Sequence, residues 1–115
     1  MSELLNTVLK TLDDKLAEDI VVIEMAKVSP FTDYFVVATG RNLRHLQSLA
    51  EFVEQAAAKD GHETRLREGG AESTWVLVDL NEVIVHLFLE DARSLYRLEA
   101  LWSDQIQYSY PETSE

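Results

Sequence analysis

The side chains that could do chemistry in this chain are few, and their spacing does not assemble a catalytic site. The histidines are His45, His62 and His86, and nothing in their spacing gathers the three or four converging ligands that a zinc site needs. Ser73, Asp79 and His86 have the residue types of a catalytic triad, but Asp79 is too far along its strand to reach His86. The sequence therefore predicts no metal, no cofactor and no catalytic residue, and favours a protein that is not an enzyme.

A second chemical candidate is the turn Thr39-Gly40-Arg41, which precedes a predicted helix and could hold an anion at the N-terminus of that helix. The turn is too short for a phosphate-binding loop or a dinucleotide fingerprint. A single glycine between a strand and a helix more often serves only the turn. The run Glu68-Gly69-Gly70 is interpreted in the same way, as a turn before a hairpin.

The predicted hairpin contains Asp79 and His86, two of the polar side chains considered above for catalysis. Residues 74–89 contain two runs rich in β-branched and aromatic residues, which we expect to pair as antiparallel strands. With the turn at Leu80-Asn81, the predicted facing pairs are Trp75 with His86, Leu77 with Ile84, and Asp79 with Glu82.

Alternation along the two strands divides the hairpin into two unlike faces. One face is aliphatic and is expected in the core: Val76, Val78, Val83, Val85, Leu87 and Leu89. The other face mixes aromatic, aliphatic and acidic groups: Trp75, Leu77, Asp79, Glu82, Ile84, His86 and Phe88. An apolar centre with acidic neighbours suits a basic protein partner, although a helix covering this face would return Trp75 to the core.

The remaining periodicity predicts a single α/β (α+β) domain with helices beside a mixed, five-stranded sheet, in the order αββαβββα. The expected helices are residues 2–17 with Ser2 as N-cap, a helix from N-cap Asn42 to Gly61, and one starting near N-cap Asp91. The expected strands outside the hairpin are residues 19–24, 32–40 and 62–67. The domain is predicted over residues 1–103, and residues 104–115 are predicted to be a weakly ordered, polar and acidic tail.

Charge and composition narrow the classes of partner. The 115 residues carry a formal net charge of -11, and the half from Glu68 onward holds ten acidic and two basic residues. Such a surface repels phosphate backbones, so little direct RNA contact is expected, and it attracts basic proteins. The chain has no cysteine, no signal-peptide pattern and no apolar run long enough for a membrane, which together predict a cytoplasmic protein without membrane contact.

Several segments, taken in order, form a recognisable set: 33–40, His45, Glu68-Gly69, 75–79, 83–86 and 93–102. With these segments the chain resembles the Iojap-related family of bacterial ribosomal silencing factors, from about Leu4 to Trp102. The chain departs from the family pattern at the hairpin turn, where Asn81 stands in the usual place of glycine. Asparagine tolerates the left-handed conformation, so the turn is expected to survive.

The resemblance implies a fold similar in shape to nucleotidyltransferases and a role without catalysis. It implies binding to protein fourteen of the large (50S) ribosomal subunit at the intersubunit face, which blocks joining of the small subunit and lowers translation when nutrients are short. Carried over by position, it implies these partner contacts: Glu68, Trp75, Leu77, Asp79, His86 and Phe88. Trp75 and Phe88 would supply apolar area, Glu68 and Asp79 would meet lysine or arginine, and His86 would donate or accept.

Two alternatives remain open from the sequence. A nucleotidyltransferase-like enzyme is suggested by the implied shape, but Thr39-Gly40-Arg41 is not followed by closely spaced aspartates that could hold magnesium. A dimeric interaction module is the other alternative, because an apolar sheet face can associate with a second copy and give a homodimer when the protein is free.

Overall fold

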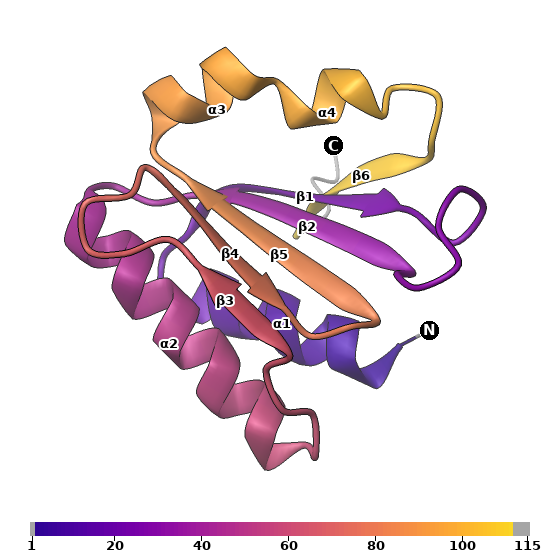
Figure 1. Ribbon diagram of the computed structural model, residues 1–115, viewed down its shortest axis with the longest axis horizontal. Coiled ribbons are helices and arrows are strands. Elements are labelled where there is room, and N and C mark those ends of the chain that lie inside the picture. The colour runs from indigo at the N-terminus through magenta and orange to yellow at the C-terminus, as the bar shows by residue number, and fades with distance from the viewer. Residues whose placement is uncertain (1, 112–115) are drawn as a thin grey trace.

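The computed structural model describes residues 2–111, in which a six-stranded sheet lies between two layers of helices (Figure 1). The strand order is β3-β4-β5-β2-β1-β6. The strands are β1 (Glu18–Glu24), β2 (Tyr34–Thr39), β3 (Leu66–Glu68), β4 (Trp75–Asp79), β5 (Val83–Phe88) and β6 (Gln107–Tyr110). The helices are α1 (Glu3–Asp14), α2 (Leu43–Lys59), α3 (Glu90–Tyr96) and α4 (Leu98–Leu101).

The helices α1 and α2 lie on one face of the sheet, and both begin at the predicted caps. The Ser2 hydroxyl accepts a hydrogen bond from the Leu5 N–H at 3.1 Å, and the Asn42 amide oxygen accepts one from the His45 N–H at 2.8 Å. These side chains satisfy N–H groups that the first helical turn cannot pair internally. After α2, Gly61 takes a φ of +88°, as expected for the residue that ends a helix.

The aliphatic face of the hairpin is buried beneath α1 and α2, as its alternation predicts. Five of its side chains have no exposed surface: Val76, Val78, Val83, Val85 and Leu87. They pack with apolar residues of α1 and α2 such as Val8, Leu12, Leu46 and Val53, each also fully buried. Leu89, at the end of this face, is only partly buried. This layer forms the larger hydrophobic core and fixes which side of the hairpin remains for other contacts.

The sheet is mixed, as predicted, because β2 runs parallel to β5 while all other neighbouring pairs are antiparallel. The predicted count of five strands is wrong by one. The additional strand, β6, pairs with β1 and lies inside the segment that the sequence predicts as a weakly ordered tail. Tyr108 and Tyr110 pack against the larger core, and aromatic residues at alternate positions favour a strand even in a polar stretch. Residues 112–115 of the predicted tail lie outside the described residues.

The C-terminal helix also differs from its prediction. It begins at Glu90 with Leu89 as its cap residue, so Asp91 lies inside the first turn and is not the N-cap. It ends at Tyr96, because its C-cap residue Arg97 takes a left-handed φ of 50°, and α4 follows as a separate short helix. The predicted strand at 62–67 is likewise shorter and later, at 66–68. No helix within residues 2–111 is long and apolar enough to cross a membrane.

Candidate protein-interaction site

The second face of the hairpin is set by a strand register that is two residues away from the predicted one. Trp75 lies opposite Phe88, Leu77 opposite His86, and Asp79 opposite Ile84. The turn is at Asn81-Glu82, because the Leu80 N–H donates to the Val83 carbonyl at 2.9 Å and Asn81 takes a φ of +75°. A shift of two residues keeps every side chain on its predicted face, so the mixed composition of this face survives the correction.

The helices α3 and α4 cover part of this face, in the layer opposite α1 and α2 (Figure 1). Phe88 is completely buried beside Ala92, and the Trp75 ring lies 4.9 Å from the Phe88 ring and 4.7 Å from the Tyr96 ring. The prediction that Phe88 offers area to a partner does not fit this burial, because α3 already occupies that area. Trp75 itself stays partly exposed.

His86 is held at the centre of the aromatic cluster, with only 5% of its surface exposed. The Trp75 Nε1–H donates to His86 Nδ1 at 3.2 Å, and the Phe35 ring centroid lies 4.6 Å from the imidazole centroid. Tryptophan can only donate, so the neutral imidazole carries its proton on Nε2, which has no partner among the described residues. The predicted role of His86 in direct contact with a partner does not fit this burial, and it instead accepts from Trp75.

Burial also changes the acid–base behaviour of His86. Removal of the imidazole from water penalises its charged form and lowers its pKa from 6.5 to about 4. A protonated imidazole would have no acceptor for the Trp75 N–H, so this hydrogen bond, like burial, favours the neutral form and lowers the pKa of His86. His86 is therefore a neutral structural residue at physiological pH.

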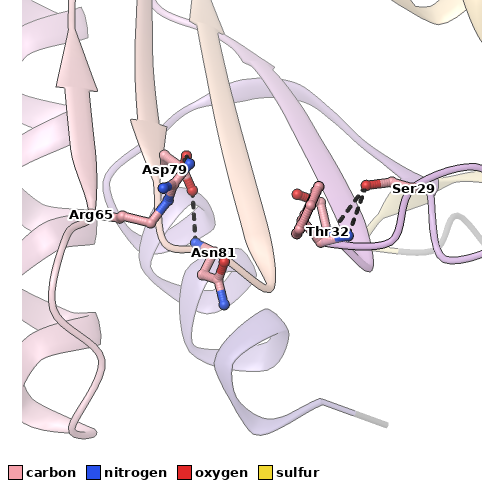
Figure 2. A network of polar contacts seen from close by, with 6 residues as sticks. Ser29, Thr32, Arg65, Asp79 and Asn81 are labelled. Atoms are coloured by element: carbon pink, nitrogen blue, oxygen red, sulfur yellow. Dashed lines mark hydrogen bonds and ion pairs between the residues drawn. The ribbon is translucent and has the colours of Figure 1, made fainter.

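Asp79 is also buried, with 5% of its surface exposed, and its carboxylate is occupied by this chain's own groups (Figure 2). Oδ1 accepts from the Asn81 N–H at 2.8 Å, which fixes the turn, while Oδ2 receives Arg65 Nη2 at 3.1 Å. Figure 2 also shows Ser29 and Thr32 in the loop after β1, where the Ser29 hydroxyl accepts from the Thr32 N–H at 3.1 Å. The sequence predicts the carboxylate of Asp79 as a contact for a cation but does not predict Arg65 as the cation beside it.

An apolar area on this face is left without a helix above it. It consists of Leu66 on β3, Leu77 on β4 and Ile84 on β5, and we call these three residues the β3–β5 patch. The pairing of Leu66 with Asp79, and of Asp79 with Ile84, places the carboxylate between two members of the patch. Leu66 is 45% exposed, and Leu77 and Ile84 are partly exposed. An apolar surface around a charged group can bind a protein but holds no reacting group.

Glu68 forms the outer border of the patch. It is exposed on β3, directly opposite Leu77, so its carboxylate is accessible to a partner that covers the patch. The next residue, Gly69, takes a φ of +105°, and a Cβ there would lie 2.8 Å from the Trp75 carbonyl oxygen. Only glycine fits this close approach, which brings β3 beside β4 and thereby places Glu68 at the edge of the patch.

A separate hollow of about 620 Å³ lies near the C-terminal ends of β2 and β5, and charged side chains line it. Arg93 dominates it, donating to the Asp19 carbonyl at 2.7 Å, to the Thr39 hydroxyl at 2.8 Å and to the Glu99 carboxylate at 2.8 Å. Because each of these donors already has a partner, Arg93 ties α3 and α4 to the sheet. Within residues 2–111, no three His, Cys, Asp or Glu side chains are grouped closely enough to hold a metal ion.

Of the six predicted contact residues, Glu68, Trp75 and Leu77 have accessible surface, whereas Asp79, His86 and Phe88 are buried. Ile84 lies on the face predicted for it, although it was not among the predicted contacts, and neither Leu66 nor Arg65 was predicted at the site. The alternation of Leu66 with Glu68 on one short strand is the signal that would have found Leu66. The position of Arg65 depends on tertiary pairing and has no local signal.

The site is an apolar, acid-bordered patch on a small mixed-sheet domain, a composition that suits contact with another protein. The family model described as "Ribosomal silencing factor during starvation" matches residues 1–115. A ribosomal silencing factor of Bacillus subtilis is 42% identical over 92 residues, which cover 80% of this chain and 78% of that protein. The chain belongs to the ribosomal silencing factor family, as the resemblance in its sequence indicates.

A solved structure and a mitochondrial protein are also similar to this chain. The crystal structure of a protein from Chromobacterium violaceum has a TM-score of 0.83 and 32% identity, and the match covers 90% of this chain and 88% of that one. A mouse protein named "Mitochondrial assembly of ribosomal large subunit protein 1" is 31% identical over 91 residues, covering 76% of this chain and 40% of its own length. The fold is therefore shared with a solved structure, and a relative's name refers to the large ribosomal subunit.

Proposed function

We propose that the protein binds a basic protein of the large ribosomal subunit at the intersubunit face, and that it blocks association with the small subunit by its bulk. The single observation that carries this proposal is the β3–β5 patch, an apolar surface with a carboxylate in it on a chain of net charge -11. Family membership supports the ribosome as the target. Protein fourteen of the large subunit is the partner that the sequence resemblance implies.

The patch supports a protein partner more than an RNA partner. Glu68 is exposed beside Leu77, so negative charge borders the surface. The carboxylate of Asp79 lies between Leu66 and Ile84, where Arg65 of this chain pairs with it. Phosphates would be repelled there, whereas lysine or arginine side chains would be attracted. The apolar residues supply the area that is removed from water when a partner covers them.

The proposed action needs no chemistry, only occupancy. A protein of 13.1 kDa placed on the intersubunit face would prevent the close approach of the small subunit. Lower translation during nutrient shortage, action in the cytoplasm and a homodimer in the free state belong to the same proposal. A homodimer formed through the β3–β5 patch would compete with the ribosome, because both contacts would use the same surface.

The test of binding is co-sedimentation of the protein with isolated large subunits, using a matched pair of variants. Leu66→Arg places bulk and positive charge on the patch, and we expect its binding to be weaker by about tenfold. Leu16→Arg makes the same change at a residue that is 59% exposed after α1, in the opposite layer, and we expect wild-type binding.

Two outcomes would contradict the proposal at different levels. Equal binding by Leu66→Arg and Leu16→Arg would show that the patch is not the contact surface. Absence of binding by the wild-type protein would contradict the assignment to the large subunit. Far-UV circular dichroism of each variant before sedimentation shows whether the variant is folded, so that a loss of binding by a folded variant is assigned to the changed surface.

A further inference from the structure

The ion pair between Arg65 and Asp79 joins an exposed side chain to a buried one. The Asp79 side chain is 7% exposed, whereas the Arg65 side chain is 67% exposed and reaches the carboxylate from outside (Figure 2). Both guanidinium contacts fall on the same oxygen, Oδ2, from Nε at 3.3 Å and Nη2 at 3.1 Å. Strong guanidinium–carboxylate pairs use two oxygens at about 2.7–2.9 Å, so this pair is a loose one.

The carboxylate, in contrast, is held in place independently of that side chain. Oδ1 of Asp79 accepts from the Asn81 N–H at 2.8 Å, and the Asp79 carbonyl accepts from the Arg65 N–H at 2.8 Å. The main chain on both sides therefore stays paired if the Arg65 side chain rotates into water. Oδ2 would then lack its cation, and a buried carboxylate without a partner is unfavourable.

We propose that Arg65 is an exchangeable cation, which occupies Asp79 in the free protein and is replaced there by a lysine or arginine side chain of the basic partner. The inference rests on the proposed function and adds how Asp79 is used within it. Leu66 and Ile84 flank Asp79 on the sheet face, so a partner that covers the patch comes close to the carboxylate and to the exposed Arg65 side chain. One ion pair breaks as another forms, and the charge of the buried oxygen is never left unpaired.

The exchange makes Asp79 a source of specificity more than of affinity. A partner surface that lacks a cation at this place would displace Arg65 without replacing it, and would bind more weakly. The neighbouring Arg67 cannot substitute as the competitor, because it faces the other way and is paired with Glu54 at 2.7 Å and with Gln47. Displacement of Arg65 is therefore compensated only when the partner supplies a cation of its own.

The experiment measures affinity for isolated large subunits with a charge-matched pair of variants. Arg65→Gln removes the internal cation, while Arg44→Gln makes the same change of net charge at an exposed position on α2, in the opposite layer. We expect Arg65→Gln to bind about two- to fivefold more tightly than Arg44→Gln, because a mostly exposed ion pair contributes up to about that factor and no longer has to be broken.

The same pair of measurements in an Asp79→Asn background separates the competition for the Asp79 carboxylate from the effect of the changed net charge. We expect no difference between Arg65→Gln and Arg44→Gln there, because the carboxylate for which Arg65 competes is gone. Three outcomes would each overturn the exchange: equal affinities of the two variants when Asp79 is present, weaker binding by Arg65→Gln, or a gain in affinity that persists in the Asp79→Asn background. Failure of the wild-type protein to bind large subunits would overturn the proposed function, and the exchange with it.

Discussion

The buried imidazole of His86 predicts a specific dependence of stability on pH. Folding lowers the pKa of His86 from 6.5 to about 4, so between these values the unfolded chain binds a proton that the folded protein does not. Stability therefore rises with pH through this window. The contribution is complete above pH 6.5 and is lost progressively as the pH falls toward 4.

The size of the effect follows from the two pKa values. The full shift corresponds to about 3 kcal/mol, and about 2 kcal/mol of this is lost between pH 7.5 and pH 5.0. The matched variant is His86→Gln, which does not titrate but keeps an acceptor for the Trp75 N–H. His45, His62 and the carboxylates are the same in both proteins, so the difference between the two proteins isolates His86.

The assay is urea unfolding followed by far-UV circular dichroism at pH 7.5 and pH 5.0. We expect the free energy of unfolding of the wild-type protein to fall by about 2 kcal/mol more than that of His86→Gln. Equal losses in the two proteins would refute the reasoning. Titration of the His86 imidazole by NMR gives a second measure, and a midpoint near 6.5 in the folded protein would refute it as well.

Three further predictions concern the elements that position the site, each measured as the free energy of unfolding in urea. Asn42→Ala removes the cap of α2 and is expected to cost about 1 kcal/mol. Asn81→Val places a β-branched residue at a φ of +75° and is expected to cost about 1–2 kcal/mol, whereas Asn81→Gly should match the wild type; equal stability of the two variants would contradict the assigned turn. Arg93→Met removes the ties of α3 to the sheet and leaves Glu99 unpaired, at an expected cost of about 2 kcal/mol, and an unchanged stability would show that these contacts do not hold α3.

The sequence predicts the two faces of the hairpin correctly because alternation is a local property. Val76 and Val78 face one way and Trp75 and Leu77 the other, whatever the register of the strands. The register itself depends on the turn, which lies at Asn81-Glu82, one residue beyond the predicted place. The resulting shift of two residues changed the facing pairs but not the faces.

The elements that could not be predicted from the sequence depend on contacts between distant segments. Strand β6 has only four residues, so the local signal of its two tyrosines is short, and its pairing with β1 completes the strand. The break between α3 and α4 falls at Arg97, without a glycine or proline to indicate it. Phe88 is buried because α3 lies over the sheet, and His86 is buried among the rings of Phe35, Trp75 and Phe88. Alternation cannot predict either burial, since the pattern shows which side chains share a face but not what covers that face.

The consequence for function is a narrower contact surface than the sequence indicated. Leu66, Leu77 and Ile84 form an accessible apolar area on this face of the hairpin, whereas Phe88 and His86 on the same face are buried. Trp75 belongs to both sets, because its ring packs against Phe88 and the residue remains partly exposed. Substitution of Trp75 would therefore alter both folding and binding, and Leu66→Arg is the cleaner probe of the surface.

The measurement that tests the central claim most directly is subunit joining followed by light scattering. Large subunits are incubated with the protein, small subunits are then added, and the yield of the joined ribosome is recorded against protein concentration. The account predicts that the yield falls as the large subunits become occupied, and that Leu66→Arg requires about tenfold more protein for the same fall. Full joining with large subunits that sedimentation shows to be saturated with the protein would contradict it.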